Sequence, residues 1–388
     1  MQPGRQDNRE RRRGLGPVAL RLRRAGALIP LALVCALGAI AAPAFGAAPA
    51  FAQASGTWVT TGSMTTAGSV ATLLQNGQVL ALGAISGSGE YLTSAELYKP
   101  PTGAWSATGN MTTARSQGIF TATPLQDGEV LIAGGKNPTS GVLASAELYN
   151  PATGTFSPTG SMTEARSGAT ATLLPDGEVL MAGGFNNAGT YLASAELYNP
   201  ATATFSPTGS MATARGYHTA TLLQNGEVLV AGGQNSTGFP DSAELYNPAT
   251  GKWTATGNES NTLFGAHAVL LANGEVFEVG NGGITELYNP ATGRWSPGAK
   301  FDDRSRFSVT LLATGKVLVA GGQVYSPRPT HFVASALLYD PTTGTFAPTG
   351  GMNAARAGQL AVLLQSGQVL VAGGTKVAPF GSAELYQP

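Results

Sequence analysis

The chain has 388 residues, of which 53 are glycine and only 11% are charged. This composition favours a turn-rich β protein over a helical one, because glycine weakens helix interiors and marks turns. A hydrophobic fraction of 43% is enough to bury a sizeable core and argues against a disordered chain. The first 54 residues hold eight of the 22 basic and two of the 22 acidic residues, so the remainder carries 14 and 20. We therefore expect no nucleic-acid partner for this mildly acidic remainder.

The first 54 residues are predicted to form a signal peptide. A basic stretch ends at Arg24, an apolar stretch covers about residues 25–42, and small residues then offer sites for cleavage. The alternative is an uncleaved N-terminal anchor, the one case in which a membrane partner is expected. The apolar stretch is short for a spanning helix and contains Pro30. Residues 55–388 are thus expected to form a secreted, periplasmic or cell-surface domain. With Cys35 in the leader, this domain would have no disulfide and no thiolate chemistry.

An internal repeat dominates the rest of the chain. The unit Ser-Ala-Glu-Leu-Tyr-Asn-Pro, or a near copy, occurs seven times, and its tyrosines are 42 to 51 residues apart. These tyrosines are Tyr98, Tyr149, Tyr198, Tyr246, Tyr288, Tyr339 and Tyr386. In the first six copies a Trp or Phe follows seven residues later: Trp105, Phe156, Phe205, Trp253, Trp295 and Phe346. We interpret the repeated aromatic residues as packing residues.

Each repeat is predicted to contain four short strands. A stretch such as Ala220–Gly233 gives a first strand, a tight turn with Asn-Gly, and a second strand that ends at a double glycine. The Ser-Ala-Glu-Leu-Tyr stretch gives the third strand. A second tight turn containing Pro and Gly leads to the fourth strand, which carries the Trp or Phe.

The four apolar residues, the double glycine, the Tyr and the Trp or Phe at fixed spacing resemble the repeat of the Kelch family over residues 56–388. This resemblance implies an all-β fold, a seven-bladed β-propeller of four-stranded blades that is similar to the central domain of galactose oxidase. The chain ends after a third strand, whereas Gly56–Met64 matches the fourth-strand stretch Gly154–Met162. We therefore expect the last blade to be closed by an N-terminal strand, which removes an open sheet edge.

The loops of the expected propeller divide between its two faces. The turns between strands one and two and between strands three and four share one face and are nearly identical in every repeat. The two–three loops and the links to the next blade share the other face and diverge, which is typical of a binding surface. The longest variable loop, residues 323–332, supplies four candidate ligand contacts: Tyr325, Arg328, His331 and Phe332.

A recurring arginine precedes the innermost strand in five blades: Arg115, Arg166, Arg215, Arg304 and Arg356. Similarly placed arginines receive acidic peptides in Kelch domains of animal ubiquitin-ligase adaptors, so the resemblance implies that these five could hold a carboxylate at the funnel mouth. The alternative is structural pairing with the glutamates of the third strands: Glu96, Glu147, Glu196, Glu244, Glu286 and Glu384. Strict pairing is not expected, because blades 1 and 5 keep Glu without Arg and Leu337 replaces Glu in blade 6.

The sequence offers little catalytic machinery. His218 and His267 are expected on opposite sides of the pleat, which disfavours a two-histidine metal site, and His331 lies in the variable loop. Copper radical oxidases of the galactose oxidase type need a cysteine crosslinked to tyrosine, and Cys35 in the leader excludes that chemistry. No catalytic residue, cofactor or metal is therefore expected.

Three functions follow as hypotheses. The first is a monomeric, extracytoplasmic binding module that holds a protein or glycan ligand on the variable face and funnel mouth, without catalysis. The second is a sugar-modifying enzyme similar to the sialic-acid mutarotase propellers, which needs only a positioned acid and base. The third is an architectural cell-surface protein.

Overall fold

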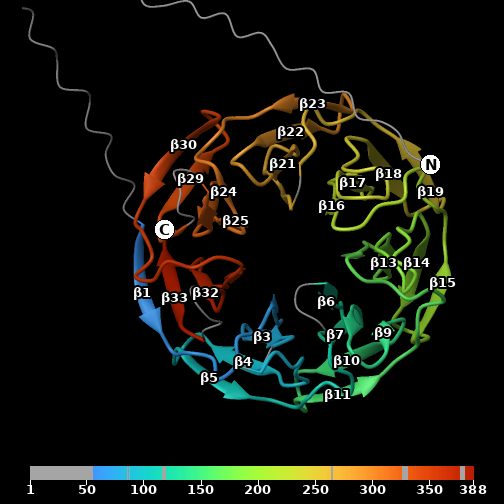
Figure 1. Cartoon of the computed structure of the whole chain (residues 1–388), viewed down its shortest axis with the longest axis horizontal. Coiled ribbons are helices and arrows are strands. Elements are labelled where there is room, and N and C mark those ends of the chain that lie inside the picture. The colour runs from blue at the N-terminus through green and yellow to red at the C-terminus, as the bar shows by residue number, and fades with distance from the viewer. Residues whose placement is uncertain are drawn as a thin grey trace, which may run out of the picture. The chain divides into compact units, whose positions relative to one another are not determined.

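The computed structural model describes residues 56–84, 86, 88–115, 119–263, 265–325, 331–375 and 381–388, which belong to one compact unit. These residues form seven four-stranded antiparallel sheets and no helix. Figure 1 shows the sheets arranged as blades around a central axis. The expected all-β propeller fold is confirmed, and the seven sheets agree with the number of repeats. In this part of the chain, no helix is long and apolar enough to cross a membrane. The predicted leader and Arg328 lie outside the described residues.

Each blade runs from an innermost first strand to an outermost fourth strand. The first strands are β2 (Val70–Leu73), β6 (Phe120–Pro124), β12 (Thr170–Leu173), β16 (Thr219–Leu222), β20 (His267–Leu270), β25 (Ser308–Leu311) and β31 (Leu360–Leu363). The second strands are β3 (Val79–Leu82), β7 (Val130–Gly134), β13 (Val179–Ala182), β17 (Val228–Ala231), β21 (Val276–Val279), β26 (Val317–Ala320) and β32 (Val369–Ala372).

The third strands carry the repeated tyrosine. They are β4 (Glu96–Lys99), β10 (Ala146–Asn150), β14 (Ala195–Asn199), β18 (Ala243–Asn247), β22 (Thr285–Asn289), β29 (Ala336–Asp340) and β33 (Ala383–Gln387). The fourth strands are β5 (Ala104–Ala107), β11 (Thr155–Pro158), β15 (Thr204–Pro207), β19 (Lys252–Ala255), β23 (Arg294–Pro297), β30 (Thr345–Thr349) and, from the start of the described chain, β1 (Thr57–Thr61).

The two ends of the chain share the last blade. β1 pairs antiparallel with β33 in the register Thr57 to Gln387 through Thr61 to Ala383, so the sheet order is β1-β33-β32-β31. Each innermost strand also contacts the innermost strands of both neighbouring blades, including β2 with β31. The prediction that an N-terminal strand closes the last blade is confirmed (Figure 1).

The core consists of seven apolar clusters, and each one lies between two adjacent blades. The second strands supply the largest share of it because both of their faces are covered, which explains why runs such as Val228–Ala231 do not alternate. The repeated tyrosines are no more than 1% exposed. Tyr149 is typical: its ring lies 4.7 Å from the Phe156 ring, and its hydroxyl is 2.9 Å from the hydroxyl of Thr108 in the preceding blade. The aromatic residues thus join blades, as predicted.

One turn departs from the repeat. The three–four turns have glycine in the left-handed region at five equivalent positions: Gly103, Gly154, Gly251, Gly293 and Gly344. Blade 3 has Ala203 there with φ 55°. We expect Ala203→Gly to raise the free energy of unfolding by about 0.5–1 kcal/mol, because a Cβ is unfavourable at positive φ. Urea unfolding checks this, with Gly251→Ala as the opposite change in the next blade. A destabilised Ala203→Gly variant would contradict it.

The loops divide between the two faces as expected. The one–two and three–four turns line common grooves, such as the one containing Gln78 and Pro100. On the other face the linkers pair with the two–three loops, as in the bridges Ser167–Phe185 and Gly216–Gln234. Small additional strands extend this variable face: β8 (Lys136–Asn137), β9 (Gly141–Val142), β24 (Arg304–Ser305), β27 (Gln323–Val324) and β28 (His331–Phe332).

Candidate functional site

The five recurring arginines are buried, each with at most 1% of its surface exposed. Arg166 shows the common pattern. Its Nη1 donates to the carbonyl of Gly183 at 3.0 Å and to that of Ser194 at 2.8 Å, and its Nη2 donates to Oε1 of Glu196 at 3.0 Å. The guanidinium therefore clamps the diverging ends of the second and third strands of its own blade.

The expectation that these arginines face a ligand is corrected by this geometry. Four of them pair with the third-strand glutamate: Arg115 with Glu147, Arg166 with Glu196, Arg215 with Glu244 and Arg356 with Glu384. Arg304 contacts Asp302 instead. Their Nη donors are engaged by carbonyl, hydroxyl and carboxylate oxygens inside the blades, and the side chains are buried, so they do not reach the surface of the funnel mouth. The arginines instead have the structural role given as the alternative, in which they pair with carboxylates inside the blades.

The glutamates have a second role that explains why they persist without arginine. In every blade that has it, the carboxylate accepts two backbone N–H groups from the preceding linker. Glu96 accepts those of Thr65 and Thr66 at 2.9 and 2.8 Å, and Glu286 accepts those of Ser260 and Asn261 at 2.9 and 2.6 Å. These bonds help to lower the pKa of Glu96, although burial opposes them. In blade 6, where Leu337 replaces Glu, Asp302 of the linker supplies the carboxylate for Arg304.

A rim of backbone hydrogen bonds connects the linkers just before the innermost strands. The N–H of Tyr217 donates to the carbonyl of Gly168 at 2.8 Å, and the N–H of Gly358 donates to the carbonyl of Arg306 at 2.7 Å. Five equivalent rim residues have left-handed backbones: Gly168 (φ 64°), Tyr217 (φ 56°), Gly265 (φ 60°), Arg306 (φ 56°) and Gly358 (φ 64°). Glycine adopts this conformation readily, whereas a side chain there costs about 1–2 kcal/mol. Two blades therefore carry a large side chain at a position that favours glycine.

Tyr217 belongs to an exposed aromatic cluster on the variable face. Its ring is 5.6 Å from the ring of Phe185, which lies 6.2 Å from that of Tyr191. The Tyr217 side chain is 40% exposed. Phe185 and Tyr191 come from the two–three loop of blade 3 and are bridged to one another through their backbones. The cluster thus presents a partly exposed tyrosine ring that packs against the ring of Phe185.

Arg306 is an exposed arginine of this face. It lies two residues after buried Arg304, and its Nη2 donates to the hydroxyl of Thr375 at 3.2 Å. Next to it, the hydroxyl of Ser305 donates to the hydroxyl of Tyr325 at 3.1 Å, and Tyr325 is 47% exposed. Tyr217 and Arg306 stand in blades 4 and 6. Between them, blade 5 has the shortest two–three loop, at Asn281–Gly283.

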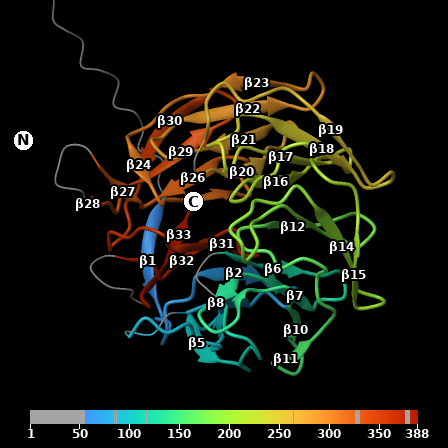
Figure 2. The ribbon, with the colours of Figure 1, turned by 45° about the vertical axis from the view of Figure 1, so that its right-hand side comes forward.

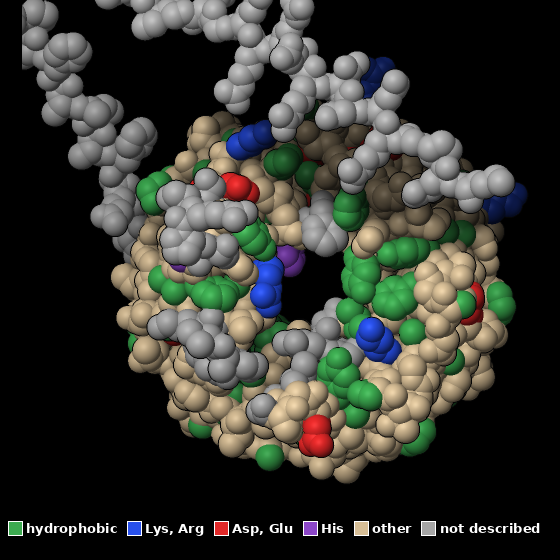
Figure 3. Space-filling view, viewed as in Figure 1, with side chains coloured by type: hydrophobic (Ala, Val, Ile, Leu, Met, Phe, Trp, Pro, Cys, Tyr) green, Lys and Arg blue, Asp and Glu red, His purple; other side chains and the backbone are tan. Residues whose placement is uncertain are grey.

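The structure brings part of the predicted blade-6 loop to this surface. β27 pairs with β24 and β28, so the loop forms a small sheet with the linker that carries Arg304. Figure 2 shows β24, β27 and β28 together beside blade 6. His331 is exposed and Phe332 is half-buried on β28. Figure 3 shows a central opening in the ring, with basic and hydrophobic side chains along its rim on the face in view.

Sequence reasoning selected Tyr325, His331 and Phe332 but missed Tyr217 and Arg306. The signal was present in the linkers. The residue two positions after the recurring arginine is glycine in blades 3 and 7, Tyr217 in blade 4 and Arg306 in blade 6.

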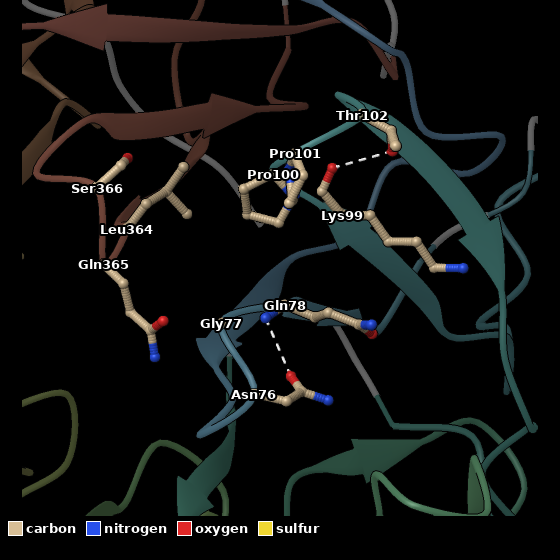
Figure 4. A pocket seen from close by; sticks show the side chains of 10 residues that line it. All are labelled: Asn76, Gly77, Gln78, Lys99, Pro100, Pro101, Thr102, Leu364, Gln365 and Ser366. Atoms are coloured by element: carbon tan, nitrogen blue, oxygen red, sulfur yellow. Dashed lines mark hydrogen bonds between the residues drawn. The ribbon is translucent and has the colours of Figure 1, made fainter.

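Grooves on the opposite, uniform face are products of the repeat. Figure 4 shows the one between blades 7 and 1, a groove of about 410 Å³ whose lining includes Gln78, Lys99 and Gln365. Similar grooves of about 340 to 450 Å³ lie between other neighbouring blades. Their linings come each time from the one–two turns of two neighbouring blades and from one three–four turn, so the grooves follow the repeat around the ring.

The histidines do not converge on a metal site. His218 is buried towards blade 3, where its Nε2 is 2.9 Å from the Thr170 hydroxyl, and burial lowers its pKa to about 3. His267 instead lies against the Phe307 ring on the blade-6 side. In the part of the chain that the structure describes, no three His, Cys, Asp or Glu side chains could hold a metal ion together. The described residues therefore do not supply the ligands of a copper centre.

Comparison with known proteins supports the fold. A model of the Kelch motif matches residues 215–258. None of the curated proteins matches the chain. Among solved structures, a fungal alcohol oxidase of the AA5 family, in complex with copper, is similar with a TM-score of 0.68 and 17% identity over 86% of this chain and 76% of that one. At this identity the likeness concerns the fold alone. Together with the repeats and the sheet topology, these matches show a β-propeller whose repeats resemble the Kelch motif and whose fold is similar to that of the oxidase.

Proposed function

We propose that the propeller is a binding module whose ligand is held on the variable face by Tyr217, Arg306 and Tyr325. The observation that carries the proposal is the left-handed backbone of Tyr217 and Arg306 at positions where blades 3, 5 and 7 have glycine. Large side chains held in a left-handed backbone on a surface are found at functional sites, where the strain is retained for a purpose.

The chemistry of the three side chains defines the ligand class. The exposed Tyr217 ring, backed by Phe185, suits the apolar face of a sugar or of another flat group. The Arg306 guanidinium suits a carboxylate or another anionic group, because it presents several donors in a fixed plane. An acidic glycan or a carboxylate-bearing peptide satisfies both. His331 and Phe332 are proposed as outer contacts, as is Arg328.

The proposed setting is extracytoplasmic, and it rests on the basic and apolar pattern of the first 54 residues. Low charge and an abundance of Thr, Ser and Gly on the turns are compatible with that setting. We expect the propeller to act there as a binding partner of a cell-surface or extracellular ligand.

Glycan and peptide arrays, followed by calorimetry on the best ligand, test the proposal. Tyr217→Gly and Arg306→Gly each remove a side chain while relieving the backbone. We expect each to weaken binding about 10- to 100-fold, the equivalent of a charge-assisted hydrogen bond or an aromatic contact, with stability unchanged or higher. The matched control is Ala203→Gly, which makes the same backbone change on the opposite face and should leave affinity unchanged. Unchanged affinity in the double rim variant would refute the proposed site.

The same ligands distinguish a binding module from a sugar-modifying enzyme. Exchange between anomers, followed by NMR with each sugar that binds, should proceed at its uncatalysed rate. Accelerated exchange would replace the binding proposal by the mutarotase-like alternative.

A further inference from the structure

Two buried acids occupy apolar positions of the repeat at the junction of blades 4 and 5. Glu278 stands on β21 where the other blades have Ala81, Ile132, Met181, Val230, Val319 and Val371. Glu259 stands in the linker where Met64, Met111, Met162, Met211 and Met352 stand in five others. Glu278 is fully buried and Glu259 is 4% exposed. Ionised carboxylates at such positions are costly unless they are paired.

The surroundings of the two carboxyls do not supply that pairing. Both oxygens of Glu259 and one of Glu278 lack a hydrogen-bond partner of normal geometry among the described residues. The other Glu278 oxygen accepts from the Thr219 hydroxyl at 3.2 Å. Glu286, directly across the sheet from Glu278, adds a third carboxylate. The recurring arginine of this junction is replaced by Leu263.

The other charged groups around the pair leave it electrostatically unbalanced. From blade 4, Arg215 donates to the carbonyl of Gly232, and a Cβ on Gly232 would lie 3.1 Å from Glu259 Oε1. Arg215 is itself paired with Glu244. Asp241 contributes its backbone carbonyl to the Glu259 N–H, while its side chain is exposed.

The two neighbouring histidines face away from the pair. His218 is directed towards Thr170 of blade 3, and His267 towards Phe307 of the blade-6 linker. The missing partner of the two carboxyls is thus best supplied by a proton.

We propose that Glu259 and Glu278 form a proton-sensitive joint: protonated, they hold the linker 257–265 against blade 4, and loss of the proton loosens it. Burial first, and then the neighbouring carboxylates, raise the pKa of Glu259, and burial raises the pKa of Glu278. A carboxyl with a raised pKa binds protons more tightly in the closed state. The closed state is therefore favoured at acidic pH and is weakened as the pH rises above the ordinary carboxyl pKa of 4.5.

Hydrogen exchange at pH 5.5, 6.5 and 7.5, in the presence of EDTA, tests the joint. After correction for intrinsic rates, the opening constant of residues 257–270 should rise up to about tenfold per pH unit for each proton released. Amides of blade 2 serve as the internal reference and should not change. The variant Glu259→Met with Glu278→Val restores the residues of the other blades and should abolish the pH dependence at this junction.

Two further samples keep the test decisive. Glu259→Gln with Glu278→Gln preserves shape and removes the charge, so it should also be independent of pH if the first variant folds poorly. Glu90→Gln, an exposed acid in blade 1, should behave as the wild type. The proposal fails if the junction keeps its pH dependence in both double variants. It also fails if Ca²⁺ added at pH 7.5 restores protection, because the acids would then hold a cation and not a proton. Ligand binding plays no part in either outcome.

Discussion

Replacing Glu147 by alanine is expected to lower the free energy of unfolding by about 3–5 kcal/mol, although the residue lies far from the proposed ligand site. The change leaves the buried guanidinium of Arg115 without its carboxylate, which stood 3.0 Å away. It also leaves the backbone N–H groups of Thr112 and Thr113 without their acceptor. Burial already lowers the pKa of Arg115, and Glu147 opposes that shift, so the arginine depends on this partner.

Blade 1 provides the matched control for this prediction. Glu96 accepts the two equivalent backbone N–H groups and the hydroxyls of Thr65 and Thr66, but its blade has no recurring arginine. Glu96→Ala should therefore cost only the lost hydrogen bonds, about 1–3 kcal/mol. Arg115→Leu, which copies blade 5, should also cost less than Glu147→Ala because Glu147 keeps its two N–H donors. Urea unfolding of the three variants measures the differences. If Glu147→Ala and Glu96→Ala lowered the free energy of unfolding equally, the Arg115–Glu147 pair would add nothing to the hydrogen bonds between the glutamate and the linker.

Removing residues 1–61 is expected to prevent the propeller from remaining a stable monomer, whereas removing residues 1–55 is expected to leave it intact. The longer deletion takes away β1 and with it the closing pairing to β33. It also removes Trp58, whose ring lies 5.1 Å from that of Tyr386 and whose Nε1 donates to the Gly350 carbonyl. Trp58 is half-buried, so the loss of its packing adds to the loss of the strand pairing.

The longer deletion is also expected to make the protein associate with itself. β33 would become an open sheet edge, which favours association with other chains. Size-exclusion chromatography with light scattering should show oligomers or aggregates for the longer deletion. A synthetic peptide of residues 56–64 should restore the monomer by occupying the vacant position. A monodisperse protein with an unchanged melting temperature would contradict the closing role of β1.

The fold could be predicted from the sequence because the turn residues, the strand patterns and the aromatic spacing of the repeat all indicate the same four-stranded blade. Turn residues, apolar second strands and the Tyr with its Trp or Phe recur in every blade or nearly so. The last repeat has no fourth strand of its own, and Gly56–Met64 matches that strand, so a blade shared by the two ends could be predicted. Regular features of this kind are set by local chemistry and by packing between identical neighbours. The fold predicted from the sequence therefore agrees closely with the observed one.

For the candidate site, the sequence could predict only the variable face of the propeller and the blade-6 loop, residues 323–332. Recurrence drew attention to the arginines, but a residue that recurs in most blades is expected to serve the scaffold common to them. Tyr217 and Arg306 break the repeat, and their significance depends on a left-handed backbone that a sequence does not display. Glu259 and Glu278 also break it, and their proximity across the junction arises only when the blades pack.

A footprint of the bound ligand tests the central claim most directly. Hydrogen exchange of the propeller with and without its best array ligand should show protection at residues 185–191, 216–218, 305–306 and 323–325, all on the variable face. The turns around Gln78, Lys99 and Gln365, which line the groove on the opposite face, should exchange at the same rate in both samples. Protection confined to those turns would place the ligand on the repeated scaffold surface and contradict the account.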